Sequence, residues 1–172
     1  MIKFTKNPEK AMQCLLWILN RKPGINKYNI MKVMFDADCY HLNKYGRPIY
    51  GENYVAMNYG TVPSLMKDLL EITQNVPFYK CSKNGFKANS SPTLDVFSDT
   101  DIEALEHGIS EYADLSFSEV KNKNHIHPAW EKHKEELKNT RSCPIPYEDM
   151  INNEDVLADL EDMGDLTEKM VF

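Results

Sequence analysis

Residues 35–63 of the chain read FDADCYHLNKYGRPIYGENYVAMNYGTVP, and this stretch decides the fold. An apolar pattern with helical spacing enters it from Ile30 and stops at Gly46, a residue type that suits the left-handed position after a helix. Beyond Pro48 the pattern changes to strand-forming tyrosine, isoleucine and valine, interrupted by two glycines. The sequence therefore predicts a long helix that starts after Asn26 and ends at Gly46, followed by short strands or an ordered loop.

Apolar residues at steps of three and four predict further helices on both sides of this stretch. The first has Asn7 as its cap and a proline in its first turn. A later one opens with Ser116 and Glu119 at capping-box spacing. The expected further helices are residues 8–20, a segment opened by Thr61 and Pro63 that buries Leu65, Met66, Leu69 and Leu70, residues 101–112, a short helix from Ser116, and one from His127 to about Leu137.

Between residues 76 and 97 the pattern is β, with Asn84-Gly85 as a hairpin turn that would pair Lys83 with Phe86 and Cys81 with Ala88. Residues 94–97 are expected to add another strand, and residues 143–146 a proline-rich joint. The predicted fold class is mainly α (α+β). It is a single compact helical domain with a small antiparallel β element in the middle, plus a C-terminal acidic amphipathic helix or tail.

The composition is that of an ordinary globular protein, with 172 residues, 42% hydrophobic residues and a net charge of −6. No apolar run approaches the roughly 18 residues that a membrane-spanning helix needs, and no signal peptide is recognisable. The four cysteines are far apart in sequence, and none has zinc-type C-x-x-C spacing. We therefore expect a cytoplasmic protein with reduced thiols and no membrane partner.

Negative charge is concentrated at the C-terminal end. Residues 148–172 contain nine acidic side chains and one lysine, with Ile151, Val156, Leu160, Met163 and Leu166 between them. We predict a domain over residues 1–147 and an acidic extension over residues 148–172. The extension could plug the basic cleft of a partner, or it could fold back on its own domain or remain a solvated appendage. The near-neutral remainder argues against nucleic acid, which binds dense basic faces.

The sequence offers no convincing catalytic or metal site. His125 and His127, with His133 six residues later, invite a metal hypothesis, but their spacing favours solvated histidines in a loop that leads into a helix. Asp36 and Asp38 point about 200° apart on a helix, which favours salt bridges over shared acid–base chemistry. No phosphate-binding or nucleophile motif is present. We predict no enzyme, no catalytic residue, no metal and no cofactor.

Aromatic and basic residues mix in the segment after the long helix, at Arg47, Tyr50, Tyr54 and Tyr59. Such a segment can bind a protein, because tyrosine and arginine dominate interface hot spots. It can also stack on a nucleic-acid single strand, or form a tyrosine-rich edge of the core. These three interpretations remain open on the residues alone.

Several short motifs of the chain resemble those of the Panacea domain, the SocA-like antitoxin family, which is also described as phage-associated. They are, in order, the segments Phe35-Asp36-Ala37-Asp38, Tyr45-Gly46-Arg47-Pro48-Ile49, Gly51, Tyr54-Val55-Ala56-Met57, Tyr59-Gly60 and Val62-Pro63. Residues 118–130 are similar to the family's late helix pair, which ends in a proline–tryptophan element. The resemblance spans roughly residues 8–147. Thr61 departs from it, because the family usually has proline there.

The resemblance implies an antitoxin of a toxin–antitoxin system that neutralises a cognate toxin by direct protein–protein binding. The alternatives are a nucleic-acid-binding regulator and, with less support, a metal-dependent enzyme. The chain lacks the separate helix-turn-helix module of some relatives, which argues against autorepression, and no residue pattern indicates its oligomeric state. Because loops carry recognition more often than helix cores do, we expect the toxin-binding residues to be Arg47, Tyr50, Glu52, Tyr54, Asn58 and Tyr59.

Overall fold

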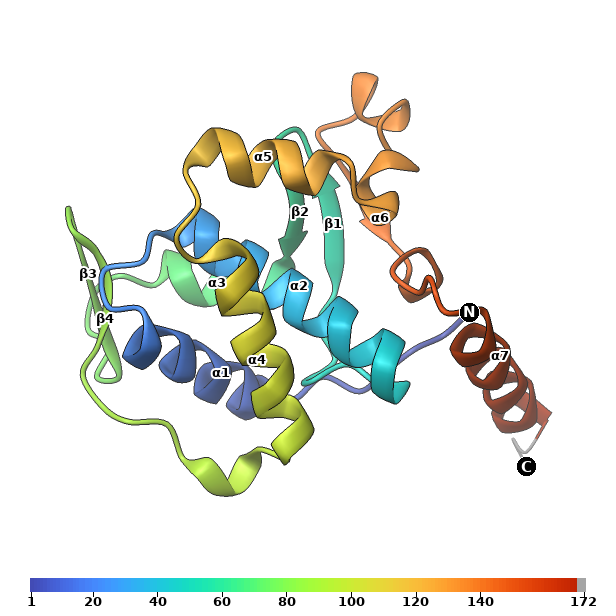
Figure 1. Cartoon of the computed structure of the whole chain (residues 1–172), viewed down its shortest axis with the longest axis horizontal. Helices are drawn as coiled ribbons and strands as arrows, with labels where there is room; N and C mark the ends of the chain where they lie inside the picture. Colours follow the sequence, from blue (N-terminus) through green and yellow to red (C-terminus); the bar gives the residue numbers. More distant parts are fainter. Residues whose placement is uncertain (170–172) are drawn as a thin grey trace.

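Figure 1 shows the computed structural model of the chain, which describes the backbone of residues 1–169 and the side chains of residues 1–164. The described residues form seven helices and two small antiparallel sheets, so the chain is mainly α with a small β element, as predicted. The helices are α1 (Pro8–Arg21), α2 (Lys27–Tyr45), α3 (Ser64–Glu71), α4 (Asp99–Tyr112), α5 (Phe117–His125), α6 (Pro128–Glu131) and α7 (Glu154–Lys169). The strands are β1 (Tyr54–Met57), β2 (Gly60–Pro63), β3 (Tyr79–Ser82), β4 (Gly85–Ala88) and β5 (Ser142–Ile145), and short 3₁₀ turns are η1 (Leu94–Val96), η2 (Glu136–Lys138) and η3 (Tyr147–Asp149).

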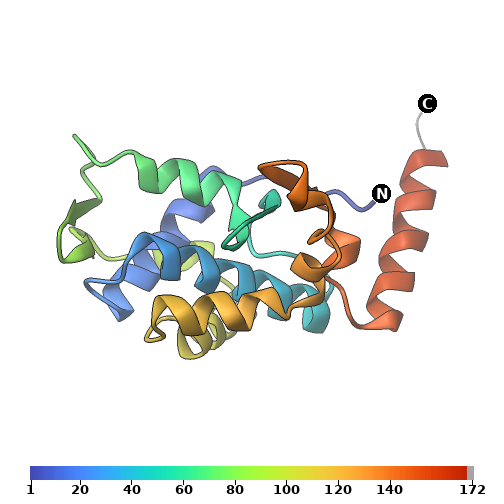
Figure 2. The ribbon, with the colours of Figure 1, turned by 90° about the horizontal axis from the view of Figure 1, so that it is seen from above.

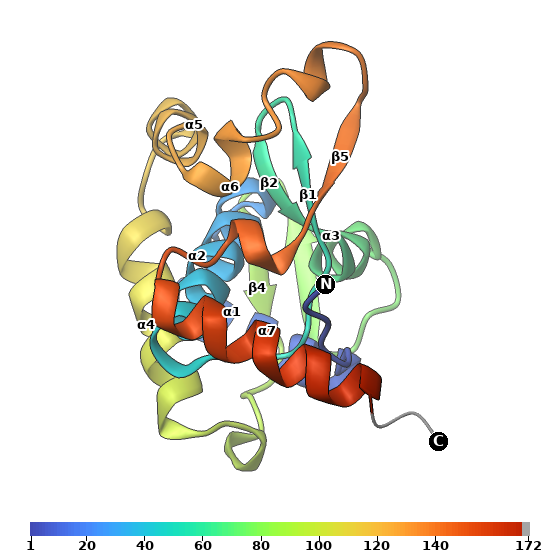
Figure 3. The same ribbon diagram turned by 90° about the vertical axis from the view of Figure 1, so that its right-hand side faces the viewer.

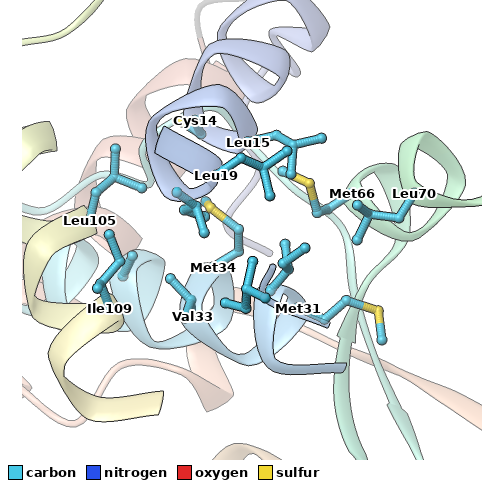
Figure 4. Packing of buried hydrophobic residues seen from close by; sticks show 14 of the residues in the cluster. Cys14, Leu15, Leu19, Met31, Val33, Met34, Met66, Leu70, Leu105 and Ile109 are labelled. Atoms are coloured by element: carbon cyan, nitrogen blue, oxygen red, sulfur yellow. The ribbon is translucent and has the colours of Figure 1, made fainter. Parts of the chain in front are cut away.

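Helix α2 is the central element, because two hydrophobic clusters pack on different sides of it. The first cluster joins α2 to α1, α3 and α4, and Figure 4 shows Met34 of α2 among leucines and isoleucines of these helices. The second cluster receives Phe35 of α2 and is completed by β1, β5, Trp130 and the chain around Tyr147. A helix buried on both sides is not amphipathic, so α2 also buries polar side chains.

The helix ends confirm the sequence signals. The Asn7 side chain accepts a hydrogen bond from the backbone of Lys10 at 3.0 Å and so caps α1. Asn26 caps α2 in the same way, and α2 ends at Gly46 as predicted. Ser116 and Glu119 form the expected capping box of α5.

Helices α2 and α4 approach each other unusually closely. A Cβ atom built at Gly108 of α4 would lie 2.3 Å from the carbonyl oxygen of Val33 on α2. Only glycine can occupy this position at that separation. The close contact holds α4 along the middle of α2, and it positions the polar start of α4 beside the end of α2.

The main sheet has the strand order β2-β1-β5, with both pairs antiparallel. Tyr54 of β1 lies opposite Pro63 on one side and Ile145 on the other. The expected joint at residues 143–146 was therefore wrong in part, because residues 142–145 form an edge strand. Pro144 is tolerated there because an edge strand pairs on one side alone.

Thr61, the departure from the family pattern, has a specific role in β2. Its backbone N–H donates to Asn124 Oδ1 at 2.7 Å, and the Asn124 side chain donates back to the Thr61 hydroxyl at 3.0 Å. Proline at this position would lack both the N–H and the hydroxyl. Thr61 and Asn124 are fully buried, so this reciprocal pair joins the sheet to α5 inside the core.

The β3–β4 hairpin exists, but its predicted register was wrong by two residues. Cys81 lies opposite Phe86 rather than Ala88, and Gly85 is the first residue of β4. Among the described residues of the turn, Gly85 alone has a positive φ, whereas the expected turn needs one at Asn84 as well. A side chain at Gly85 would collide with the backbone of Gly24, so its packing against the α1–α2 connection sets the register.

Two other local expectations were also wrong. Residues 94–96 form the exposed turn η1 instead of a strand, and no strand among the described residues pairs with them. The helix expected from His127 to Leu137 ends at Glu131, and η2 follows after a turn.

Helix α7 begins at Glu154, and Figures 1, 2 and 3 show it at one end of the molecule beside the N-terminus. Val156, Leu157 and Leu160 pack against the second cluster, while the acidic side chains as far as Asp162 are exposed. The preceding residues belong to the core, because Met150 and Ile151 are buried. The side chains of Asp165, Leu166 and Glu168 lie outside the described residues. The predicted division at residue 147 stays a prediction.

None of the described helices has the length and apolar character that crossing a membrane requires.

Candidate functional site

Five of the six residues expected to bind a partner fall into two groups, and the sixth, Arg47, belongs to a separate cluster. Tyr50, Glu52 and Tyr54 are buried, with exposed fractions of 2%, 0% and 3%. Asn58 and Tyr59 lie at the exposed turn between β1 and β2, away from these three. The buried three cannot touch a partner in this structure, so the segment has an interior half and an exposed half.

Glu52 organises the interior half. One of its carboxyl oxygens accepts from the backbone of Asn53 at 2.7 Å and of Leu65 at 2.9 Å. The other accepts from the hydroxyl of Tyr50 and from the backbone of Met66, both at 3.0 Å. Helix α3 has no side-chain cap of its own, so Glu52 satisfies the free N–H groups of its first turn. This glutamate supports the fold.

Asp38 and Tyr54 extend the buried polar network into α2. The Tyr54 hydroxyl donates to Asp38 at 2.8 Å, and the backbone of Ile49 donates to the other carboxyl oxygen of Asp38 at 2.8 Å. Burial, helped by the nearby Glu52 carboxyl, raises the pKa of Asp38 to about 7 against the lowering effect of the hydrogen bonds from Ile49 and Tyr54. Asp38 therefore anchors the chain that leaves α2, and it does not share a site with Asp36.

Arg47 joins a second polar cluster at the start of α4. Its guanidinium lies 3.1 Å from Asp101, which also pairs with Lys10 at 2.7 Å. Asp101 is 1% exposed, and the two cations hold its pKa below the ordinary value despite the opposing effect of burial. His41 completes the cluster by contacting Thr100 and the Arg47 carbonyl. Arg47 is half-exposed but committed to this ion pair.

The exposed half forms a surface that we call the hairpin patch: Asn58 and Tyr59 of the β1–β2 turn, Tyr28 of α2, and Phe117 and Lys121 of α5. The Tyr59 and Phe117 side chains are 59% and 52% exposed, and their rings lie 5.6 Å apart. The Tyr28 ring lies 4.8 Å from that of Phe117, and its hydroxyl donates to the Tyr59 carbonyl at 2.6 Å. These contacts fix the aromatic side chains before any partner arrives.

A pocket of about 480 Å³ opens beside the patch, between the start of α2, the β1–β2 turn and α3. Among its described lining residues there are four basic side chains and no acidic one. Lys27 and Lys67 pair with Glu71 outside the lining, at 3.3 and 2.6 Å. Arg141 is exposed and has no ion-pair partner among the described side chains. The pocket rim is therefore positive and available to an acidic group.

Lys32 forms the floor of this pocket although its side chain is fully buried. Its ammonium donates to the carbonyl of Thr61 and lies 4.8 Å from the ring centre of Tyr28. Burial lowers the pKa of Lys32 to about 7, because the charged form loses its hydration. The charge of this floor therefore depends on pH in the neutral range.

A second pocket, of about 510 Å³, contains the side chains that acid–base or thiol chemistry would use. Asp36 Oδ2 lies 2.7 Å from His107 Nδ1, which pairs the two side chains as the predicted salt bridge of Asp36. Cys39 lies in the same pocket, but burial and the charges of Asp36 and Asp38 raise the pKa of its thiol well above the ordinary value. A reactive thiol needs the opposite shift.

The histidines of the H-x-H pair point to different surroundings and are not simply solvated as expected. His125 stacks on Trp130 at 3.7 Å, whereas His127 packs edge-on against Phe35 at 4.9 Å. Burial lowers the pKa of both imidazoles. Trp130 is 7% exposed and belongs to the second cluster. These two histidines therefore do not converge on a metal ion.

A sequence model of the family described as "Antitoxin SocA-like, Panacea domain" matches residues 30–131, which is more than half of the chain. The chain therefore belongs to this family of SocA-like antitoxins. The matched range contains α2 from Ile30 onward, both halves of the segment after it, and every residue of the hairpin patch except Tyr28. The family assignment supports an antitoxin role in general, and hence a toxin as partner. Searches among curated proteins and among solved structures find no match to the chain.

Sequence reasoning missed Tyr28, Phe117 and Arg141, which surround Asn58 and Tyr59 in space. Phe117 did carry a signal, because it is the first residue after a capping serine and therefore lies at an exposed helix start. Tyr28 lies one position further into its helix, as the second residue after the capping Asn26 of α2. Arg141 has no local signal, since only the pairing of β5 with β1 brings its neighbourhood to the pocket.

Proposed function

We propose that the chain neutralises a cognate toxin by binding it directly, as a non-enzymatic antitoxin, and that the hairpin patch is its toxin-binding surface. The match to the antitoxin family over residues 30–131 carries the proposal. The alternatives, a nucleic-acid-binding regulator and a metal-dependent enzyme, have no comparable support. The shifted pKa of Cys39 and the salt bridge of Asp36 favour binding over catalysis.

The physical properties of the hairpin patch suit a protein partner. Exposed aromatic rings that are already held in place lose little freedom on binding, and aromatic residues with arginine dominate interface hot spots. Tyr59 and Phe117 supply the rings, and Arg141 of the adjoining pocket supplies a cation without an ion-pair partner among the described side chains. The matching toxin surface should be apolar at its centre with an acidic group that reaches Arg141.

The test is co-expression of the chain with the product of the adjacent gene, followed by growth measurements and copurification. Tyr59→Ala together with Phe117→Ala should reduce rescue at least 100-fold in plating efficiency. The matched control is Phe78→Ala, another exposed aromatic residue outside the patch, which should rescue fully. Both variants should keep the melting temperature of the parent within a few degrees.

Three outcomes separate the parts of this proposal. Full rescue by the double variant would move the toxin-binding surface elsewhere but keep the antitoxin function. A neighbouring product that is harmless when expressed alone, and that does not copurify, would count against neutralisation itself. Retention on heparin at low salt, lost in the Arg141→Ala variant, would favour the nucleic-acid alternative.

The acidic helix offers a second contact with the toxin. Truncation after Asn153 removes α7 but keeps the buried residues Met150 and Ile151. If the acids of α7 enter a basic cleft, truncation should weaken toxin binding about tenfold and make it less sensitive to salt. Unchanged affinity and salt dependence would assign α7 to its own domain, against which Val156, Leu157 and Leu160 already pack.

A further inference from the structure

Three side chains with metal-binding groups converge after the end of the family match. His133 follows α6, Glu136 begins η2, and Cys143 lies on β5. One potential ligand atom from each lies within 4.8 Å of the other two, and His133 Nδ1 is 3.7 Å from Glu136 Oε2. Glu136 and Cys143 are separated by seven residues and by the turn into β5, so the fold rather than local spacing brings them together.

Asp149 holds the imidazole of His133 from the other side. Its carboxylate lies 3.0 Å from His133 Nε2 and is itself fixed by Lys132 Nζ at 2.7 Å. This contact favours the tautomer with the proton on Nε2, which leaves the lone pair of Nδ1 directed at Glu136. Histidines that bind metals commonly have such a carboxylate on the nitrogen that does not bind the metal.

One imidazole nitrogen, one carboxylate oxygen and one thiolate sulfur form a ligand set that suits Zn²⁺. Bonds of about 2.0–2.3 Å in tetrahedral geometry place ligand atoms roughly 3.3–3.6 Å apart. The present separations exceed this by at most about 1.5 Å, so metal binding requires rotation of the Glu136 side chain, which is 57% exposed, together with a small shift of the His133 ring. Cys143 provides the fixed point, since it is paired with Ala56 in the sheet and is 1% exposed.

We propose that His133, Glu136 and Cys143 bind one Zn²⁺ ion per chain, with water as the fourth ligand and Asp149 as a positioning residue. The ion would join strand β5 to the loop after α6. Few apolar contacts hold that loop otherwise. Leu137 of η2 is its buried apolar residue. The proposal does not depend on the antitoxin function.

The test uses the full-length protein, freed of metal with a chelator and titrated with Zn²⁺ by calorimetry under reducing conditions. We expect one ion per chain with a dissociation constant below about 1 μM, and proton release on binding. Cobalt(II), used as a coloured substitute, should give the intense near-ultraviolet band of a thiolate–cobalt bond. This band shows that the parent protein has a cysteine ligand, whatever the stability of any variant.

Cys143→Ser should abolish the cobalt band and weaken zinc binding at least 100-fold. Cys81→Ser is the matched control, because Cys81 is the exposed cysteine and lies on the other sheet. Glu136→Gln changes an exposed side chain, so its metal-free form should fold like the parent while binding zinc more weakly. Asp149→Asn should weaken zinc binding about 10- to 100-fold with the same stoichiometry.

The proposal fails if the parent binds no zinc at micromolar concentration, or if its cobalt complex has no thiolate band. It also fails if Cys81→Ser removes the band while Cys143→Ser keeps it. Equal affinity of the parent and Glu136→Gln, both folded, would exclude the carboxylate from the site and overturn the three-ligand arrangement.

Discussion

Tyr54 and Tyr59 stand five positions apart on one hairpin, yet their exposed fractions are 3% and 59%. Tyr54 points into the second cluster, where its hydroxyl meets Asp38. Tyr59 extends from the turn and touches Phe117 at the surface. The comparison shows that neither the residue type nor the position in the family motif tells whether a side chain supports the fold or is free to contact a partner. What separates the two roles is whether another part of the chain covers the side chain.

The largest effect should come from the centre of the interior half. Glu52→Ala removes the acceptor of four hydrogen bonds and leaves buried N–H groups at the start of α3 without partners. We expect a loss of about 3–5 kcal/mol in the free energy of unfolding, measured with urea. Glu9→Ala, at an exposed position, should change it by less than about 0.5 kcal/mol. A loss for Glu52→Ala as small as that of the control would mean that the interior half does not support α3.

A second effect distinguishes the two halves by pH. The pKa of Asp38 in the folded chain, about 7, lies above its ordinary value near 4. Between these values the folded chain keeps a proton that the unfolded chain has lost. The stability that Asp38 contributes is therefore fully present below about pH 4 and is lost as the pH rises to about 7.

Asp38→Asn cannot titrate, so its stability relative to the parent should improve as the pH rises from 4 to 7, by up to about 4 kcal/mol. Urea unfolding of both proteins at several pH values measures this difference. The exposed Asp95→Asn should show no such trend. A constant difference between Asp38→Asn and the parent across this range would show that Asp38 is not protonated in the folded chain.

The smallest expected effect comes from comparing the stability of Tyr54→Phe directly with that of Tyr59→Phe. Tyr54→Phe removes one buried hydroxyl and leaves one of the two carboxyl oxygens of Asp38 without a donor, which should cost about 1–2 kcal/mol. Tyr59→Phe removes an exposed hydroxyl and should cost almost nothing. Thermal unfolding of the two variants side by side checks this, and equal melting temperatures would contradict the division into two halves.

The sequence predicted the elements that local chemistry determines. Asn7, Asn26 and Gly46 bound α1 and α2 as expected, since capping depends on residues within one turn. The sequence did not predict β5, because a segment that contains proline has a weak strand pattern. Pairing with β1 is what makes this segment a strand. The sequence also predicted the β3–β4 register wrongly, because the contact of Gly85 with Gly24 links segments 61 residues apart.

The candidate site was predicted less well, for a related reason. Polar residues between two helices are usually exposed, so Tyr50, Glu52 and Tyr54 were grouped with Asn58 and Tyr59. Their burial depends on partners as distant as Tyr147, whose hydroxyl donates to the Glu52 carbonyl. The same holds for the buried Lys32 of α2, because its ammonium meets the carbonyl of Thr61 on β2, a partner that the pattern of the helix does not indicate.

The contact of Tyr147 with Glu52 also sets an order of events during synthesis. All buried members of the first cluster lie at or before Val120, so that cluster can assemble while the later residues are still being translated. The second cluster requires Tyr147, Met150 and Ile151. It can close only after these residues have emerged from the ribosome. A nascent chain should therefore pass through a stage in which α2 is covered on one side only, with Phe35 and Tyr54 open to chaperones or proteases.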